Sequence, residues 1–460
     1  MAAYVIAVDN GSQSTKVSIF DAEGAVHASA RVALRPYDSP APGRWEHPDD
    51  DLWTSIVAAI REALARFDGD ASEIRALGLC TIRFCRAVLR ADGSLAQPVM
   101  SWMDERVSRA YEAEAPEARY VTTSSGYIAH RLTGRFRDTA GNYQGVWPID
   151  PERWDWSEDP GAYVRTGMRR EQLFELVEPG AVLGGVTSAA AAETGLPQGL
   201  PVIATSNDKA VEALGAGLRS DREALLSLGT YVSVMMTGTR QQTSPEHAYW
   251  VNFGADPEHY LLESAGVRRG MWTVSWFRDL VSGMTEDELG RGAESVPPGA
   301  DGLVVSLDWL APDDEPHRRG AIVGFNGTQG RFHVYRAILE ALAITMADNC
   351  ERMAEELERR LEGVVVTGGG AASELMLSVL AAVFGVPVRR PEFTDAAGVG
   401  AAIAAAVAVG MHADWDRAVA AMVRPGEKVE PDPALVDAYL DVRERYARVV
   451  PRVRALFAEG

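Results

Sequence analysis

Residues 6–20 read IAVDNGSQSTKVSIF, which is an apolar strand, a turn of small polar residues and a second apolar strand. Residues 225–235 read LLSLGTYVSVM and repeat this strand–turn–strand pattern in the middle of the chain. Backbone N–H groups in a tight turn can point together and bind phosphate oxygens. Two such turns, one in each half, predict that a phosphate chain is held from two sides.

The first turn leads into a strand and not into a helix. Residues 25–34 are expected to form a third strand, so the chain opens with a three-stranded meander. In a P-loop protein the phosphate loop passes from a strand directly into a helix. The chain also has no G-x-x-x-x-G-K-[ST] sequence, so the P-loop class is excluded.

The chain divides into two similar α/β halves that join near residues 215–224. In the first half, apolar residues at helical spacing over 53–64 predict a helix, and a strand follows at 76–79. The second half restarts the pattern with strands over 224–236. A core is therefore expected in each half.

The second half continues with a long helix over about 334–361 and a buried type of strand at 364–367. Three consecutive glycines, at 368–370, end that strand. Ser373 is a favourable N-cap residue for the next helix, and Gly385 is a typical residue to end that helix.

The composition is that of a globular protein without a disulfide framework. At 460 residues we expect two or three domains, and no apolar run reaches the roughly 18 residues of a membrane span. The net charge of −20 opposes binding to nucleic acid or an anionic membrane. Cys80, Cys85 and Cys350 are expected to be buried free thiols. The N-terminus does not resemble a signal peptide, so a cytoplasmic protein is expected.

Taken in order, the motifs resemble the FGGY carbohydrate kinases, of the xylulokinase and glycerol kinase type, within the actin-like ATPase superfamily. The resemblance covers about residues 4–410. Residues 9–16, D-x-G-S-Q-S-T-K, resemble the first phosphate motif of this family, and residues 228–230 resemble the second. Residues 366–388 resemble its adenosine motif and are the most specific match. Residues 43–48, 101–106 and 131–134 match further family motifs.

The resemblance implies an α/β fold in which two ribonuclease H-like domains flank a central cleft. We expect an N-terminal FGGY domain over 1–217 and a C-terminal FGGY domain over 218–412. Residues 413–460 look helical and are expected to be an appendage.

ATP and Mg²⁺ are the implied cofactors. The residues expected to bind ATP are Gly11, Ser12, Gln13, Ser14, Lys16, Gly229, Thr230, Gly369, Gly370, Ala371 and Ser373. Asp9, at the end of the first strand, is expected to hold Mg²⁺ through water, because Mg²⁺ keeps much of its hydration.

By the same resemblance Asp208 is the catalytic base. It lies in residues 205–215, TSNDKAVEALG, where the family has an aspartate just before the domain joint. A carboxylate there can accept the proton of a sugar hydroxyl as it attacks the γ-phosphorus. The alternative is that Asp208 only caps a helix. Lys209 replaces a glutamine common in the family, and it reaches either phosphate or solvent.

Arg83, Trp102 and Asp104 are the expected substrate-binding residues. Arg83 lies where glycerol kinases carry an arginine that binds substrate hydroxyls, and the alternative for it is a buried salt bridge. Asp104 aligns with a substrate-proximal aspartate, and its alternative is a surface acid paired with Arg106. Trp102 is expected to be a wall of the site more than a specific ligand.

Two departures from the family pattern bear on the substrate. The chain between Arg106 and Arg131 is shorter than usual, so a helical segment near the sugar site is expected to be missing. Residues 307–317 keep a Pro-His pair and lack the usual Gly-Glu-Arg.

The expected function is an ATP-dependent kinase that phosphorylates a hydroxyl of a small sugar. The substrate would be a ketopentose such as xylulose, or a related ketose or polyol. One alternative is a catalytically impaired sensor that binds nucleotide or sugar. Another is an actin-like or chaperone ATPase without a sugar, which does not explain residues 43–48 or 101–106. No nucleic acid or membrane partner is expected, and a homodimer is left open.

Overall fold

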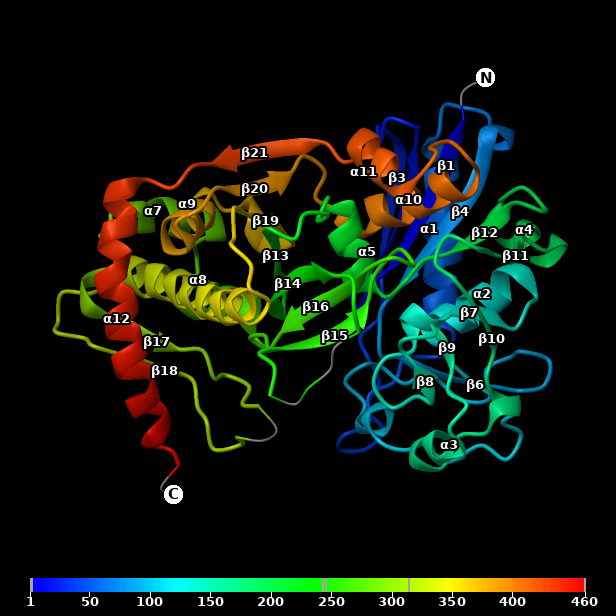
Figure 1. Cartoon of the computed structure of the whole chain (residues 1–460), viewed down its shortest axis with the longest axis horizontal. Coiled ribbons are helices and arrows are strands. Elements are labelled where there is room, and N and C mark those ends of the chain that lie inside the picture. The colour runs from blue at the N-terminus through cyan, green and yellow to red at the C-terminus, as the bar shows by residue number, and fades with distance from the viewer. Residues whose placement is uncertain (1–2, 242–243, 245, 313–314, 459–460) are drawn as a thin grey trace.

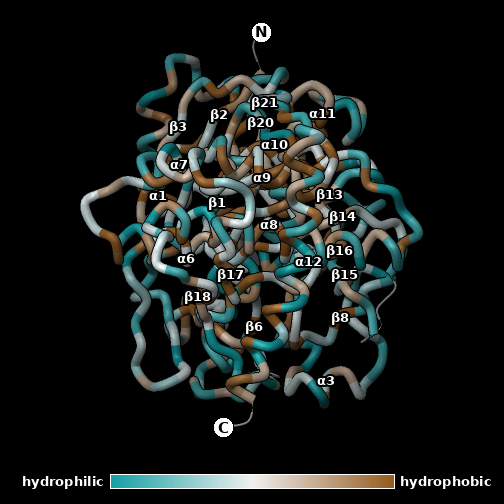
Figure 2. Tube along the Cα trace, turned by 90° about the vertical axis from the view of Figure 1, so that its left-hand side faces the viewer, coloured by the Kyte–Doolittle hydropathy of each residue, from teal (hydrophilic) through white to brown (hydrophobic). Residues whose placement is uncertain are grey.

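The computed structural model describes residues 3–241, 244, 246–312 and 315–458. Two α/β halves lie side by side, each built around one large sheet (Figure 1). Hydrophobic residues concentrate among the central strands and helices, while hydrophilic residues line the outer loops (Figure 2). No helix of the described ranges has the length and apolar character needed to cross a bilayer.

The first sheet has six strands in the order β11-β12-β4-β1-β2-β3. Their bounds are β1 Tyr4–Asn10, β2 Ser14–Phe20, β3 Val26–Ala33, β4 Ile74–Thr81, β11 Val182–Gly185 and β12 Pro201–Ala204. β1, β2 and β3 form the expected antiparallel meander, β4 and β12 run parallel to β1, and β11 is an antiparallel edge.

The second sheet repeats this arrangement with seven strands in the order β15-β16-β14-β13-β19-β20-β21. Their bounds are β13 Glu223–Leu228, β14 Val232–Gly238, β15 Tyr249–Phe253, β16 Tyr260–Ser264, β19 Gly363–Thr367, β20 Val388–Pro391 and β21 Pro425–Val429. β13, β14 and β16 are antiparallel, β19 and β20 run parallel to β13, and β21 is the antiparallel edge. The expectation of two similar halves with a ribonuclease H-like strand order is confirmed.

Some helices pack on the faces of these sheets, and others lie farther out. Their bounds are α1 Asp51–Arg66, α2 Ser124–Thr133, α3 Pro160–Thr166, α4 Ser188–Thr194, α5 Asp208–Gly215, α6 Gly270–Val281, α7 Glu286–Glu294, α8 Arg331–Glu356, α9 Glu374–Phe384, α10 Ala396–Ala408, α11 Trp415–Met422 and α12 Pro433–Ala455. The remaining strands pair in twos: β5 Arg86–Leu89 with β6 Tyr120–Thr123, β7 Arg137–Thr139 with β10 Glu175–Val177, β8 Ile149–Asp150 with β9 Asp155–Trp156, and β17 Val304–Ser306 with β18 Ala321–Val323.

Helices α5 and α10 cross in the middle of the molecule, between the two sheets (Figure 1). One buried apolar cluster joins residues of both sheets to both helices. The crossing is close because it is built on glycine. A Cβ on Gly400 would lie 2.0 Å from the carbonyl oxygen of Val211, and a Cβ on Gly215 would lie 1.8 Å from that of Ala396. Larger residues there would push the two helices apart.

The last segment of the chain differs from the expected helical appendage. It contains β21, which pairs with β20 as the edge of the second sheet. In α12 the buried hydroxyl of Tyr439 bonds to Glu340 at 2.9 Å and accepts a hydrogen bond from Arg336 at 3.0 Å. The segments β21 and α12 therefore belong to the second half, and the exact domain boundaries remain a prediction.

Candidate active site

The hairpin between β1 and β2 places Asp9 and Lys16 side by side. Lys16 Nζ lies 3.1 Å from Asp9 Oδ2 and 3.0 Å from Oδ1 of Asp395, the residue just before α10. Burial would lower the pKa of Lys16, but the two carboxylates outweigh it and raise this pKa above its ordinary value. The lysine therefore joins the first phosphate loop to the second half of the chain.

A third carboxylate, that of Asp208, adds to this group. Burial raises the pKa of Asp9 to about 7, and the charges of Asp395 and Asp208 also raise it, while Lys16 lowers it. Burial also raises the pKa of Asp208, against the effect of Arg83. Two of these carboxylates, those of Asp9 and Asp395, share one lysine. Carboxylate oxygens are ligands that Mg²⁺ prefers, and a magnesium ion near Asp9 remains a prediction.

Asp208 is the first residue of α5 and does not cap it. The cap is Asn207, whose side chain accepts a hydrogen bond from the Ala210 N–H at 3.1 Å. The alternative that Asp208 serves as a cap is therefore wrong. Its Oδ1 accepts the Lys209 N–H at 2.9 Å and lies 3.6 Å from Arg83 Nε. With 27% of its side chain exposed, Asp208 is reachable from outside.

Lys209 is 18% exposed and bonds within the protein, and its contact with a phosphate remains a prediction. Its Nζ donates to Glu212 at 2.8 Å and to Ser227 Oγ at 2.6 Å. Glu212 also accepts hydrogen bonds from Ser227 at 2.8 Å and from Thr367 Oγ1 at 2.6 Å. This network ties α5 to β13 and β19, and so fixes the helix that carries Asp208.

The second phosphate loop and the glycine-rich motif of residues 368–370 are adjacent, although about 140 residues separate them. A Cβ on Gly368 would lie 2.6 Å from the carbonyl oxygen of Leu228, and the φ of Gly368 is +83°. The Gly229 carbonyl accepts the Met271 N–H at 3.1 Å, at the start of α6. The fold thus brings two of the predicted nucleotide motifs together.

Individual residues of these motifs have different surroundings. Ser12, Gln13, Thr230 and Gly369 are exposed, and Gly229 is half-buried. Ser14, in contrast, is buried and its hydroxyl accepts a hydrogen bond from Arg31 Nε at 3.0 Å.

Ser373 caps α9 through the Met376 N–H at 3.3 Å, as its position in the sequence predicts. Its hydroxyl is thus committed to the helix, and Gly370 and Ala371 are buried beside it. The nucleotide roles of all these residues remain predictions.

Arg83, in the loop after β4, forms a bidentate ion pair across the two halves. Its Nη1 and Nη2 donate to the carboxylate of Glu263 on β16 at 2.7 and 2.9 Å. Glu263 is completely buried, and it also accepts a hydrogen bond from Ser233 Oγ at 3.0 Å. The buried salt bridge that the sequence left as an alternative is thus present, directly beside Asp208.

Asp104 and Trp102 lie in a loop with a different character. Asp104 is buried, and its carboxylate accepts hydrogen bonds from the Trp45 N–H at 2.8 Å and from Arg106 Nε and Nη2 at 2.9 and 2.7 Å. This is the alternative pairing with Arg106, but inside the protein and not on its surface. Trp102 is 42% exposed. Residues 109–119, within the stretch between Arg106 and Arg131 that was expected to be short, form neither helix nor strand.

Sequence reasoning missed Glu263 and Asp395. A glutamate inside the apolar stretch 260–264 indicates that its carboxylate is buried with a partner. The sequence does not identify this partner, because it lies 180 residues away. Asp395 stands before the alanine-rich helix α10 and has the appearance of a cap. It makes no capping hydrogen bond and binds Lys16 instead.

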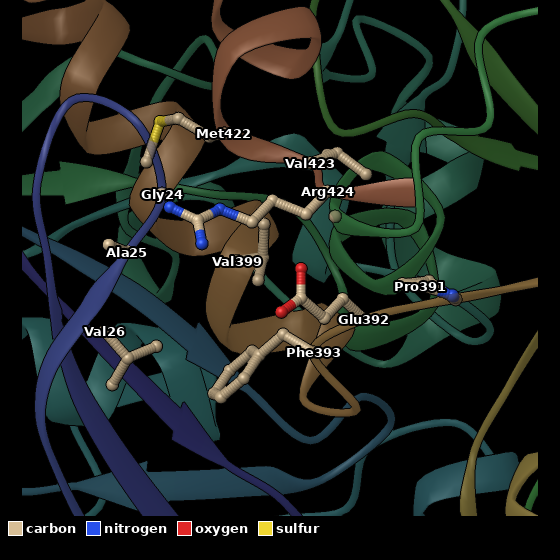
Figure 3. Close-up of a pocket in the computed structure, with 11 residues that line it drawn as sticks. Gly24, Ala25, Val26, Pro391, Glu392, Phe393, Val399, Met422, Val423 and Arg424 are labelled. Carbon is tan, nitrogen blue, oxygen red and sulfur yellow. The ribbon is translucent and has the colours of Figure 1, made fainter. Parts of the chain in front are cut away.

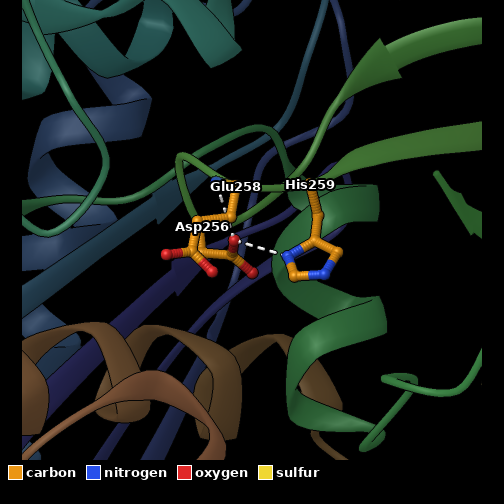
Figure 4. Close-up of side chains that lie close together, drawn as sticks. All are labelled: Asp256, Glu258 and His259. Atoms are coloured by element: carbon orange, nitrogen blue, oxygen red, sulfur yellow. Dashed lines mark hydrogen bonds and ion pairs between the residues drawn. The ribbon is translucent and has the colours of Figure 1, made fainter. Parts of the chain in front are cut away.

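Asp256, Glu258 and His259 form a further group of potential metal ligands within one turn (Figure 4). Asp256 accepts hydrogen bonds from the Glu258 N–H at 3.0 Å and pairs with His259 Nδ1 at 2.7 Å and with Arg219. These contacts hold the turn between β15 and β16, and Arg219 already balances the charge of Asp256.

A cavity of about 300 Å³ lies on the outer side of the α5–α10 crossing (Figure 3). Its walls come from the turn at Gly24, from the segment around Phe393 and from the end of α11 at Met422. It lies beyond the far end of β2 from the first phosphate loop, and is therefore separate from the group around Asp208.

Two ribonuclease H-like halves, each with a glycine-containing turn, together form the two-domain fold of the actin-like ATPases. The chain belongs to the FGGY family of carbohydrate kinases: the family's N-terminal domain matches residues 4–115 and its C-terminal domain matches residues 224–409. Members of this family are phosphotransferases that act on sugar hydroxyls and use ATP.

Relatives and solved structures agree with this assignment. The "Uncharacterized sugar kinase YgcE" of Escherichia coli (strain K12) is 44% identical over 432 residues, covering 92% of this chain and 88% of its own. The xylulose kinase structure from Rhodospirillum rubrum has a TM-score of 0.85 at 23% identity, over 99% of this chain and 100% of its own. The gluconate kinase structure from Lactobacillus acidophilus has a TM-score of 0.88 at 18% identity, over the whole of both chains. At these identities the two structures support the fold alone.

Proposed function

We propose that the chain transfers the γ-phosphate of ATP to a hydroxyl of a small sugar, either a ketopentose such as xylulose or a related ketose or polyol. The observation that carries this proposal is the position of Asp208. Its carboxylate does not cap α5, lies 3.6 Å from Arg83 and is partly exposed between the two halves. The similarity to a xylulose kinase fold is compatible with the proposed substrate.

In this proposal Asp208 is the base. It accepts the proton of the sugar hydroxyl, whose oxygen forms a bond to the γ-phosphorus while the bond from that phosphorus to the β-phosphate oxygen breaks. Burial raises the pKa of Asp208, which makes its carboxylate a better proton acceptor than an exposed aspartate. The Lys209–Glu212 pair holds the start of α5, and so keeps this base in place.

The nucleotide would lie between the two turns, with phosphates at Gly11, Ser12, Gly229 and Thr230 and adenosine at residues 369–373. Asp9 would hold Mg²⁺, which neutralises phosphate charge when bound. Lys16 would move from Asp395 toward a phosphate when ATP binds, and its side chain is 36% exposed. Trp102 would be a wall of the sugar site, and Asp104 would shape the loop that carries it. Asp104 would not contact the sugar directly, because its carboxylate already accepts hydrogen bonds from Arg106 and the Trp45 N–H.

A coupled ADP-release assay over ketopentoses, deoxysugars and polyols tests this function. We expect at least one strong substrate, and a large loss of turnover in Asp208→Asn. Asp159→Asn is the matched control, because Asp159 is an exposed cap of α3. If calorimetry shows sugar binding while the ADP-release assay shows no turnover, the alternative of a catalytically impaired sensor is supported instead. An Asp208→Asn variant as active as the wild type would overturn the role of the base.

A further inference from the structure

The Arg83 guanidinium lies between two carboxylates. Its Nη edge bonds to Glu263, and its Nε edge faces Asp208 at 3.6 Å. An arginine has five N–H groups, of which Glu263 takes two and Asp208 faces a third. Two N–H groups of Arg83 therefore remain for oxygen atoms of a substrate.

Aromatic rings hold the guanidinium from its sides. Its central carbon lies 5.2 Å from the ring centre of Phe84 and 5.3 Å from that of Trp250. The backbone of Phe84 has a φ of +65°, a conformation that is strained for a bulky residue. Strain of this kind persists where the surrounding structure fixes a functional geometry. Arg83 is thus held in one orientation by both halves of the chain.

The charges around this arginine do not balance. Arg83 brings one positive charge, while Glu263 and Asp208 bring two negative charges. Lys209 adds nothing to the balance, because Glu212 neutralises it at 2.8 Å. A site of this composition has a surplus of negative charge before any substrate enters.

We propose that Glu263 is a specificity-determining residue that restricts the sugar site to uncharged polyols and sugars and excludes sugar acids. The proposal rests on the function proposed above. A hydroxyl oxygen can accept a hydrogen bond from a free N–H of Arg83, and sugar C–H faces can pack on Trp250. The carboxylate of an aldonate would instead need the whole guanidinium fork, which Glu263 occupies. Burying a further negative charge beside Asp208 and Glu263 is unfavourable.

The test uses pairs of a neutral polyol and the acid in which one terminal CH₂OH group is replaced by a carboxylate: xylitol with xylonate, and glucitol with gluconate, with xylulose as the reference. For the wild type we expect kcat/KM of each acid to be about 100-fold or more below that of its neutral partner, because like charges oppose each other in a buried site. In Glu263→Gln we expect this ratio to fall by about tenfold, with a higher KM for neutral substrates, since one negative charge and one firm partner of Arg83 are lost.

Glu340→Gln is the matched control. Glu340 is also buried and paired with an arginine, Arg336, but on α8 and away from Asp208. We expect its acid-to-neutral ratio to equal that of the wild type. Calorimetric binding of the same pairs to the wild-type protein gives a second measurement that does not depend on the folding of a variant.

The failure of this inference differs from the failure of the proposed function. If the wild type phosphorylates or binds gluconate as well as the neutral partner, the role of Glu263 is wrong and the kinase function stands. If no compound of the whole panel is phosphorylated, the function is wrong, and the binding ratio still decides the charge preference. An unchanged ratio in folded Glu263→Gln also overturns the inference.

Discussion

The two halves repeat one arrangement, a parallel strand followed by a helix that packs between the sheets, and use it differently. In the first half β12 leads to Asp208 and α5; in the second, β20 leads to Asp395 and α10. Each helix has an aspartate at its start. Asp208 leaves the capping to Asn207 and lies open beside Arg83, whereas Asp395 is bonded to Lys16.

This difference shows that the topology determines where a carboxylate lies, whereas the residues around that carboxylate determine what it can do. Both aspartates occupy the start of a helix, where a partial positive charge favours an anion. Asp208 accepts one hydrogen bond, from the Lys209 N–H, and its nearest cation is the more distant Arg83, which Glu263 already pairs. Its carboxylate is therefore available to accept a proton, while that of Asp395 is committed to joining the halves.

The largest expected effect is that of Asp208→Asn. An amide cannot accept the proton of the sugar hydroxyl, so kcat/KM should fall by about 10³-fold, within the range for loss of a general base. Steady-state kinetics on the best substrate measure this, and calorimetry should give nearly unchanged sugar binding. A loss no larger than that of Asp395→Asn would contradict the division of roles between the two helices.

The halves also differ in a buried ionisable group. His47, in the first half, is 1% exposed, and its Nδ1 has no hydrogen-bond partner among the described residues, whereas Arg336 and Glu340 in the second half satisfy each other. Burial lowers the pKa of His47 to about 4, from 6.5. Below pH 6.5 the unfolded state therefore binds the proton more readily, and stability is lost as the pH falls toward 4.

At pH 5 the lowered pKa of His47 reduces the free energy of unfolding by about 2 kcal/mol relative to neutral pH. Urea unfolding of the wild type and of His47→Gln at pH 7.5 and pH 5 measures it. The variant should lose less stability between the two pH values, because glutamine does not titrate. Equal losses of stability would show that the pKa of His47 is not lowered in the folded state.

The crossing of the two helices should respond to Gly400→Ala. The added methyl group would lie 2.0 Å from the Val211 carbonyl oxygen, so the helices must separate, at a cost of about 2 kcal/mol in unfolding free energy. Gly290→Ala in α7 is the control, since nothing lies within 4 Å of its Cβ position. There the better helix propensity of alanine should stabilise by up to about 1 kcal/mol. Thermal unfolding that shifts equally in both variants would rule out a close crossing.

The smallest effect is expected from Asp395→Asn. It removes one of the two carboxylates that hold Lys16, and a partly exposed ion pair of this kind contributes about 1 kcal/mol, or roughly a fivefold change in KM for ATP. Titrations of ATP at saturating sugar measure it. A change in the sugar KM instead would place Asp395 in a different part of the mechanism from the one proposed.

Much of this architecture could be predicted from the sequence. The opening meander, the restart near residue 224, the strand expected at 364–367 and the cap at Ser373 all follow from local patterns, because turns, apolar periodicity and caps are short-range signals. The helix expected over 334–361 begins and ends earlier, at 331 and 356. The edge strand β21 was not predicted, because it forms only where β20 offers an unpaired edge.

The sequence by itself determined the two-fold pattern of the chain, the family and Asp208 as the candidate base, since each rests on residues that are close together in the sequence. The tertiary structure decided which charges meet. Only the packed halves bring Glu263 to Arg83 and Asp395 to Lys16, across 180 and 379 residues. Electrostatic roles depend on distance and burial in space, which local patterns do not contain.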